Sequence, residues 1–427
     1  MIRNSVQLSA TTTRKHILRI LEAGLQAVSP EQLMREQFAY EAKSDTLYVQ
    51  GKAYQLANFE KVVVIGVGKV SAHVAELIEA KMQGRIAGGI VIDIVPANTK
   101  KIVSRVGTHP LPSSVNVSAT DELVTMLQNL TAKDLVLAVI SGGGSSLLTS
   151  PQVVSLEEER KITQALMDCG VSITEMNTVR KHLSSVKGGN LAKYAYPASM
   201  ISLIFSDIPR DDISQVASGP TVLDRTTIND ATEIMNRYQV LDRCSMDHCG
   251  MRETPKEQRY FKNVTNILFC SSGVALQAME RCAHDLGLRV KVWNPAFSGE
   301  AREVAKAMLA DLEPNQCLLA AGESVVTIKD KVKGSGGRNQ EMALAALLSL
   351  PDKVTFAALN SDGHDNSDVA GALVDQATAV QAKQLGLDLS GHLAHHDEYG
   401  LLSDLGASIM TGHTGSNVSD LVVAIKE

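Results

Sequence analysis

Short, continuous apolar runs alternate with helical patterns along the first two thirds of the chain. Such runs are typical of strands that are buried on both faces of a parallel sheet. They lie at Lys61–Gly66, Gly89–Ile94, Asp134–Ile140, Met200–Phe205, Val264–Phe269 and Arg289–Trp293. Amphipathic spacing predicts helices at Thr12–Ala27 and Val70–Met82. This alternation of strand, polar turn and helix predicts an α/β fold with a mainly parallel sheet.

A second α/β pattern begins near Gln316, so we place a domain boundary near residue 310. The expected domains are residues 1–310 and 311–427. The later pattern has two β-like runs, a basic glycine-rich loop, a helix and two further strands, at Cys317–Ala321, Ser324–Lys329, Lys329–Glu341, Asn339–Leu350, Val354–Leu359 and Leu421–Ile425. Residues 242–262 are polar and aperiodic, and we expect them to form a surface excursion from the first domain.

Composition and charge indicate a globular protein that does not bind nucleic acid. The 427 residues are 44% hydrophobic and carry a formal net charge of -6, whereas phosphate backbones require a basic face. The 6 cysteines include no C-x-x-C pair, which favours reduced thiols. Met1–Lys15 lacks the apolar segment of a signal peptide, and no apolar run is long enough to span a membrane. We therefore expect a cytoplasmic protein without a membrane partner.

Two glycine-containing loops that follow predicted strands are candidate anion sites. In Ser141–Ser146 (SGGGSS), the glycines let several backbone N–H groups point at one spot, and serine hydroxyls add donors. Gly68 and Lys69 follow another strand and open a helix, so that Lys69 stands where an anion would be favoured. This second loop matches neither a Walker A motif nor a full dinucleotide fingerprint, because Ser71 holds the third glycine position.

A third loop combines lysines, glycines and the start of a helix. Its residues are Lys329, Lys331, Lys333, Gly334, Gly336 and Gly337, followed by Arg338. We interpret Lys329 and Lys331 as a solvated face. Arg338 stands between the glycines and the helix, where basic charge and free N–H groups together predict a second anion site.

Aspartates follow two of the predicted strands. Asp207 and Asp211 lie in Ser206–Asp212, and Asp362 lies in Asn360–Asp365. Carboxylates at strand ends can hold Mg²⁺ or take the proton of a hydroxyl group, although aspartate also serves often in turns and caps. A further polar loop, residues 411–417, could hold a nucleotide or only turn the chain.

These motifs, in this order, resemble the glycerate 2-kinase family, which is also called the MOFRL family and often carries the label hydroxypyruvate reductase. The matching stretches are Val64–Lys69, Gly107–Pro112, Ser141–Leu148, Asn177–Gly189, Ser206–Thr221, Lys333–Ala345, Asn360–Ala372 and Thr411–Leu421. Together they cover nearly the whole chain. The resemblance implies a Rossmann-like N-terminal domain, a smaller α/β C-terminal MOFRL domain and an active site in the cleft between them.

The resemblance also implies a reaction, the Mg²⁺-assisted transfer of a phosphoryl group from ATP to the 2-hydroxyl of D-glycerate. On the family pattern, Lys69 and Arg338 are the essential cations, and Asp207 and Asp362 are their acidic partners. We expect alanine at either cation to slow turnover by orders of magnitude and to leave folding intact. The candidate binding residues are Gly68, Ser141, Gly142, Gly143, Gly144, Ser145, Ser146, Gly336, Gly337 and Asn339. The candidate metal ligands are Asp207, Asp211 and Asp362.

Other functions stay open on the sequence alone. A reductase would need an acidic residue about 20 positions after its glycines, and Asp93 stands at roughly that distance from Gly68. A non-catalytic sugar-phosphate sensor would use the same loops but would leave the carboxylates unexplained. Arg210, where the family usually has glycine, could favour a longer or more acidic sugar acid. The sequence decides neither which aspartate is the base nor whether the chain forms a homodimer.

Overall fold

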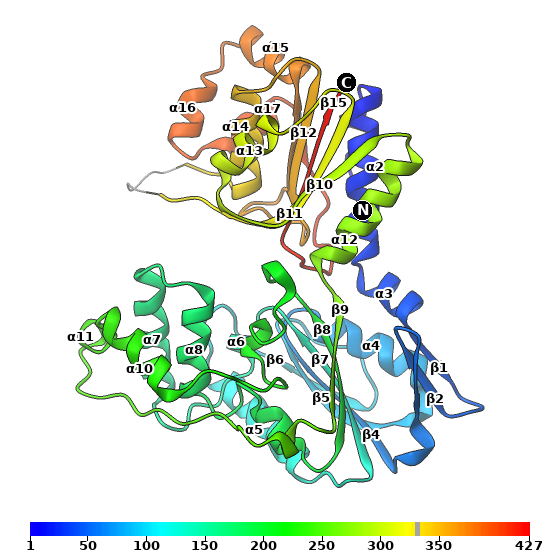
Figure 1. Ribbon diagram of the computed structural model, residues 1–427, viewed down its shortest axis with the longest axis vertical. Coiled ribbons are helices and arrows are strands. Elements are labelled where there is room, and N and C mark those ends of the chain that lie inside the picture. Colours follow the sequence, from blue (N-terminus) through cyan, green and yellow to red (C-terminus); the bar gives the residue numbers. More distant parts are fainter. Residues whose placement is uncertain (329–333) are drawn as a thin grey trace. The chain divides into compact units, whose positions relative to one another are not determined.

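The computed structural model describes residues 1–328 and 334–427 (Figure 1). Lys329, Lys331 and Lys333 of the predicted basic loop lie outside the described residues. The chain divides into two compact units. The parallel-sheet unit holds residues 33–206 and 212–269, and the mixed-sheet unit holds residues 1–32, 207–211 and 270–427. These divisions fall at other positions than the boundary predicted near residue 310. The strand Arg289–Glu300 pairs with Gln316–Val325, and the start of the chain packs against the same sheet.

The parallel-sheet unit is built on a six-stranded sheet. The strands follow the spatial order β6 (Ile102–Val106), β5 (Ile86–Asp93), β4 (Lys61–Val67), β7 (Asp134–Ser141), β8 (Ser199–Phe205) and β9 (Val264–Cys270). The pairings from β6 to β8 are all parallel. Counted along the chain, this is the 3-2-1-4-5-6 order of the doubly wound dinucleotide-binding folds. The order reverses between β4 and β7, which is where such sheets bind ligands.

The strands of this sheet are apolar because they are covered on both faces. Every residue of β7 is buried, and so is every residue of β4 except Lys61. Helix α4 (Ser71–Met82) packs against β4, β5 and β7, and α5 (Ser114–Gln128) packs against β5 and β6. The predicted parallel sheet is therefore confirmed, with strand ends that shift by a few residues at most.

A small helical core and a three-stranded sheet complete this unit. The sheet is antiparallel, with β1 (Phe38–Glu41), β2 (Thr46–Val49) and β3 (Lys52–Gln55). The core joins α7 (Leu156–Asp168), α8 (Ile173–Leu183), α10 (Ile228–Arg237) and α11 (Val240–Cys244). Met246, Cys249 and Met251 of the predicted excursion pack against that core, so the irregular segment is anchored by its apolar side chains.

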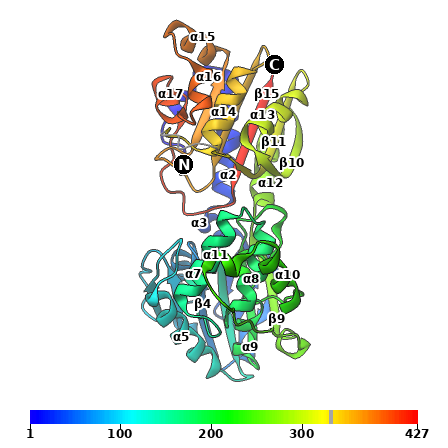
Figure 2. The same ribbon diagram turned by 90° about the vertical axis from the view of Figure 1, so that its left-hand side faces the viewer.

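The mixed-sheet unit has six strands and helices on both faces. The strand order is β10 (Arg289–Glu300), β11 (Gln316–Val325), β15 (Asp420–Lys426), β12 (Val354–Asn360), β13 (Gly371–Asp375) and β14 (Ser408–Ile409). β10 and β11 are parallel, and the other pairings are antiparallel. One face is covered by α2 (Thr12–Ala27) and α12 (Ser272–Asp285), the other by α13 (Ala301–Ala310) and α14 (Arg338–Leu348) (Figure 1, Figure 2).

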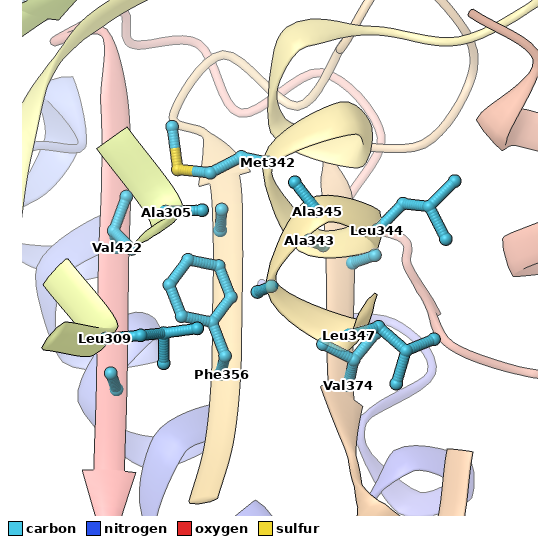
Figure 3. Packing of buried hydrophobic residues seen from close by; sticks show 14 of the residues in the cluster. Ala305, Leu309, Met342, Ala343, Leu344, Ala345, Leu347, Phe356, Val374 and Val422 are labelled. Carbon is cyan, nitrogen blue, oxygen red and sulfur yellow. The ribbon is translucent and has the colours of Figure 1, made fainter. Parts of the chain in front are cut away.

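The core of this unit lies between its sheet and α13 and α14. Figure 3 shows Phe356 and Val422 of the sheet facing Met342 of α14 and Leu309 of α13. Helix α14 is buried from Asn339 to Leu347, as expected of a helix that other elements surround.

The prediction of two separate β-like runs around Gly322 was wrong. A single strand, β11, runs through this glycine and ends at Val325. An added Cβ at Gly322 would lie 2.2 Å from the carbonyl oxygen of Phe297. The glycine therefore allows close approach of the neighbouring strand and does not make a turn.

Helix α2 is fixed to the mixed-sheet unit by a buried ion pair. Arg14 donates from Nε and Nη2 to the two carboxylate oxygens of Asp375, each at 2.6 Å. Thr13 also donates to the Glu427 carboxylate. Such a bidentate pair fixes both position and orientation. None of the helices in the described residues is long and apolar enough to cross a membrane.

Candidate functional site

The loops that follow β4 and β7 meet where the strand order of the parallel sheet reverses. The backbone N–H of Lys69 donates to the carbonyl oxygen of Gly142 at 2.9 Å, and that of Val70 to Ser141 Oγ at 3.3 Å. Gly68 has a φ of 115°, and an added Cβ would lie 2.2 Å from Ser141 Oγ. Only glycine permits this approach. The two loops, predicted separately, therefore form one site.

The glycine loop presents unused backbone donors at this site. Within the described part of the chain, the N–H groups of Gly143, Gly144 and Ser145 have no hydrogen-bond acceptor. The serine hydroxyls are occupied, since Ser146 Oγ donates to the carbonyl oxygen of Pro110 at 2.6 Å and Ser145 Oγ lies 2.8 Å from Ser218 Oγ. The predicted anion site thus offers backbone donors, while its serines hold the loop in place.

The side chain of Lys69 crosses the glycine loop beside His109. An added Cβ at Gly143 would lie 3.1 Å from Lys69 Cγ and 3.2 Å from His109 Cδ2. Partial burial and the charges of Lys69 and Arg180 lower the pKa of His109 to about 4, so this imidazole is neutral near pH 7. Lys69 is exposed, and its ammonium group has no partner among the described residues.

Helix α8 brings a second cation to this site, which the sequence analysis did not single out. Ser218 Oγ, which contacts Ser145 of the glycine loop, donates to Asn177 Oδ1 at 2.9 Å. Arg180 stands three residues after Asn177 and hence on the same face of the helix. Burial lowers the pKa of Arg180, and its guanidinium makes no hydrogen bond or ion pair with any described residue. The i, i+3 spacing of Asn177 and Arg180 was the available sequence signal.

In the mixed-sheet unit, Arg338 is held by two carboxylates. Its Nε donates to Asp420 Oδ1 at 2.9 Å, and its Nη1 donates to Glu323 Oε1 at 2.8 Å. Asp420 is fully buried, and this burial raises its pKa to about 6 although Arg338 opposes the shift. Asp420 was not a candidate on the sequence, even though it directly precedes the predicted closing strand.

The first turn of α14 is capped from within the protein. Asp365 accepts from the backbone N–H of Asn339 at 3.1 Å and from that of Gln340 at 2.8 Å. An added Cβ at Gly337 would lie 2.1 Å from the carbonyl oxygen of Asp365, and Gly336 precedes it in the same loop. The Asp365 carboxylate thus occupies the helix N-terminus to which the sequence assigned an external anion.

Asp362 lies in the turn after β12. Its Oδ1 accepts from the backbone N–H of His364 at 2.8 Å, and its carbonyl oxygen accepts from Thr414 at 3.1 Å. An added Cβ at Gly363 would lie 1.9 Å from the carbonyl oxygen of Gly412. The aspartate loop and the polar loop of residues 411–417 are therefore packed together, and Asp362 keeps a half-exposed carboxylate there.

The predicted metal ligands come from two segments of the mixed-sheet unit. Asp207 and Asp211 belong to the short segment 207–211 of the mixed-sheet unit, where the carbonyl oxygen of Asp207 accepts from Ser419 Oγ at 2.8 Å. Among the described residues, one group brings three metal-ligating atoms within 4.8 Å of one another, and it consists of Glu341, His396 and Glu398. Asp207, Asp211 and Asp362 form no such group.

Asp93, the acidic residue that a dinucleotide site would need, faces the protein interior. Its carboxylate accepts from the backbone N–H of Ala72 at 2.9 Å and from that of Ile94 at 2.6 Å. The side chain is buried, which raises its pKa. A carboxylate that caps α4 in this way is not presented to a ribose hydroxyl, which weakens the interpretation as a reductase.

Two family models match the chain. A domain of unknown function, DUF4147, matches residues 16–248, and the MOFRL family matches residues 316–420. The fold and these two matches thus define an α/β protein of the class that joins a DUF4147 domain to a MOFRL domain. The chain is 33% identical to glycerate 2-kinase of Pyrococcus horikoshii, with 96% of each chain covered. It belongs to the glycerate 2-kinase family, as the ordered motifs predicted.

Two further comparisons agree with this family. The crystal structure of glycerate kinase from Thermotoga maritima superposes with a TM-score of 0.82 at 31% identity, over 97% of this chain and 99% of that one. A protein of Agrobacterium vitis called putative hydroxypyruvate reductase is 37% identical, over 84% of this chain and 86% of that protein. Both names that the family carries therefore occur among the relatives.

Proposed function

We propose that the protein transfers the γ-phosphoryl group of ATP to the 2-hydroxyl of D-glycerate, giving 2-phosphoglycerate and ADP. The observation that carries the proposal is the site at the strand reversal. There Lys69 stands beside three backbone N–H groups, and neither its ammonium group nor those N–H groups have a partner among the described residues. Such a site suits a phosphate or carboxylate. The names of the relatives favour phosphoryl transfer over the other reactions of anionic substrates.

The chain supplies groups that position the reactants and balance charge, which is most of what phosphoryl transfer requires. In this proposal, Lys69 and Arg338 neutralise the charge that develops on the transferred group and hold the substrate carboxylate. Either Asp207 or Asp362 orients the attacking hydroxyl and takes its proton.

The magnesium ion is proposed to arrive with the nucleotide. Mg²⁺ in kinases is held by phosphate oxygens, water and one or two carboxylates, so no complete protein cage is needed. The half-exposed carboxylate of Asp362 fits that requirement. When bound, the ion would neutralise phosphate charge.

An assay of ADP release with ATP, Mg²⁺ and a panel of acids tests the proposal. The panel holds D-glycerate, L-glycerate, hydroxypyruvate and four-carbon sugar acids, and ³¹P NMR identifies the phosphorylated position. We expect release with D-glycerate and a signal from the 2-phosphate. Release only with a longer acid would keep the kinase and change its substrate. NADH consumption with hydroxypyruvate would revive the reductase, and ligand-induced thermal stabilisation without turnover would favour the sensor.

Arg180→Ala is expected to weaken catalysis without weakening the fold. A charge-assisted hydrogen bond contributes about 1.5–3 kcal/mol, so kcat/KM for D-glycerate should fall roughly 10–100-fold. The free energy of unfolding should stay equal or rise, because the guanidinium has no partner to lose within the described residues. Steady-state kinetics and urea denaturation measure the two effects. Arg237→Ala, which removes an exposed arginine of the same unit, is the matched control. Unchanged kinetics would remove Arg180 from the site.

Arg210→Gly is expected to raise the free energy of unfolding by up to about 1 kcal/mol. Arg210 is exposed with a φ of 68°, and a non-glycine residue in this region costs about 1–2 kcal/mol, partly offset by the larger unfolded-state entropy of glycine. Urea denaturation checks the value, and destabilisation would contradict it. The same variant tests whether Arg210 favours a longer acid. If it does, the ratio of the rate with a four-carbon acid to the rate with D-glycerate should be lower in Arg210→Gly than in the unchanged protein.

A further inference from the structure

We propose that Glu341, His396 and Glu398 form a binding site for a divalent cation of the Mn²⁺ or Zn²⁺ type, distinct from the cation that accompanies ATP. Glu341 lies on α14, and the other two residues lie between α16 (Leu389–Ala394) and the start of α17 (Glu398–Asp404). One ligand atom from each lies within 4.8 Å of the others. Three elements of the mixed-sheet unit thus converge on one point.

Glu398 gives independent evidence for a ligand at this site. Its side chain is 1% exposed, and its Oε1 has no hydrogen-bond partner in the described part of the chain. A buried carboxylate oxygen without a partner is costly, so such groups are normally paired or coordinate a metal. A cavity of about 250 Å³ is lined by Glu341, His396 and Glu398, together with Gly336, Gly337 and Arg338, and it gives an ion room.

When all of them are ionised, the buried carboxylates around the cluster carry two more negative charges than the neighbouring arginines balance. Four buried carboxylates gather at this end of α14, namely Glu341, Asp365, Glu398 and Asp420. Two guanidinium groups face them. Arg302 donates to Glu341 at 2.6 Å, and Arg338 donates to Asp420 at 2.9 Å. One divalent cation balances the remaining charge when His396 is neutral.

The ligand set indicates the class of cation. Mg²⁺ prefers oxygen ligands and retains several waters, whereas Zn²⁺ and Mn²⁺ accept one imidazole nitrogen with carboxylates. Glu341 Oε2 lies 2.8 Å from His396 Nδ1, and Arg302 Nη2 lies 3.2 Å from the same nitrogen. Arg302 holds the other oxygen of Glu341 and so orients this ligand.

Mn²⁺ binding to the metal-stripped full-length chain, without nucleotide, tests the site. The EPR signal of free Mn²⁺ is lost on binding, and carboxylate ligands suit Mn²⁺ while thiolates do not, so the free cysteines do not compete. We expect one bound ion per chain, displaced by Zn²⁺. Glu398→Gln and His396→Asn should each weaken binding by at least roughly 10–100-fold. Glu303→Gln and His395→Asn, at exposed neighbours in the same unit, should not.

Absence of binding would overturn the proposal, and so would equal binding by both site variants. Circular dichroism confirms that the variants are folded, and Glu398→Gln keeps the shape of the protonated side chain. Because the titration contains no nucleotide, it is independent of the kinase assay. Mn²⁺ binding without kinase activity would overturn the proposed function alone, and kinase activity without Mn²⁺ binding would overturn this site alone.

Discussion

Lys69→Ala is expected to lower kcat for D-glycerate roughly 10³-fold, the loss found when a single group that stabilises developing charge is removed. Lys69 has no ion-pair partner in the described residues and is exposed, so its removal leaves no buried charge behind. The free energy of unfolding should therefore change by less than about 0.5 kcal/mol. Kinetics at saturating ATP and D-glycerate, together with urea denaturation, measure both quantities.

Two further variants sharpen the test of Lys69. Lys81→Ala removes an exposed lysine from the last turn of the helix that Lys69 precedes, and it should leave kcat unchanged. Lys69→Arg keeps the charge and moves it, so it should recover part of the lost rate if charge is the main contribution. A near-normal kcat in Lys69→Ala would exclude this residue from catalysis.

Arg338→Ala is expected to damage both catalysis and stability. The sequence predicted that folding would stay intact, whereas the buried ion pair of Arg338 predicts a loss of stability. Its removal leaves the Asp420 carboxylate buried without its counter-ion. Breaking a buried pair costs roughly 3–5 kcal/mol, and we expect about 3 kcal/mol, because Asn339 Nδ2 still donates to Asp420 at 2.8 Å. The rate should fall roughly 10³-fold, as for Lys69.

The loss of stability should depend on pH with a definite sign. Asp420 has a folded-state pKa of about 6, above its ordinary 3.8, and loss of Arg338 raises it further. A carboxyl whose folded-state pKa is raised favours folding at low pH, and that contribution is lost as pH rises towards the folded pKa. The free energy of unfolding that Arg338→Ala loses should therefore be smaller at about pH 4.5 than at about pH 7.5.

A double variant separates the two effects of Arg338. Arg338→Ala with Asp420→Asn removes the unpaired charge, so most of the lost stability should return while the catalytic rate stays low. Glu323→Gln is the matched control, because Glu323 is exposed and its ion pair should contribute little. Full activity of the double variant would show that Arg338 acts only through the fold.

The sequence by itself determined most of the local elements and the outline of one candidate site. The expected helix Thr12–Ala27 has those same bounds in the structure, and the buried strands match because a run of apolar residues is a local property. The Lys69 site was also predictable in outline. Parallel strands bring their carboxyl ends to one edge, so loops that follow β4 and β7 must lie near each other.

Only the tertiary structure decided which side chains meet across the chain. Arg14 pairs with Asp375, 361 residues away, and this assigns the first helix to the last unit. Arg338 pairs with Asp420, 82 residues on. Asp365 caps the helix N-terminus at which the motifs predicted a bound anion, and Glu398 joins a cluster that no spacing rule indicates. The physical reason is common to all four. Periodicity fixes which face of an element is buried, whereas the partner of a buried charge depends on which distant segment folds against that face.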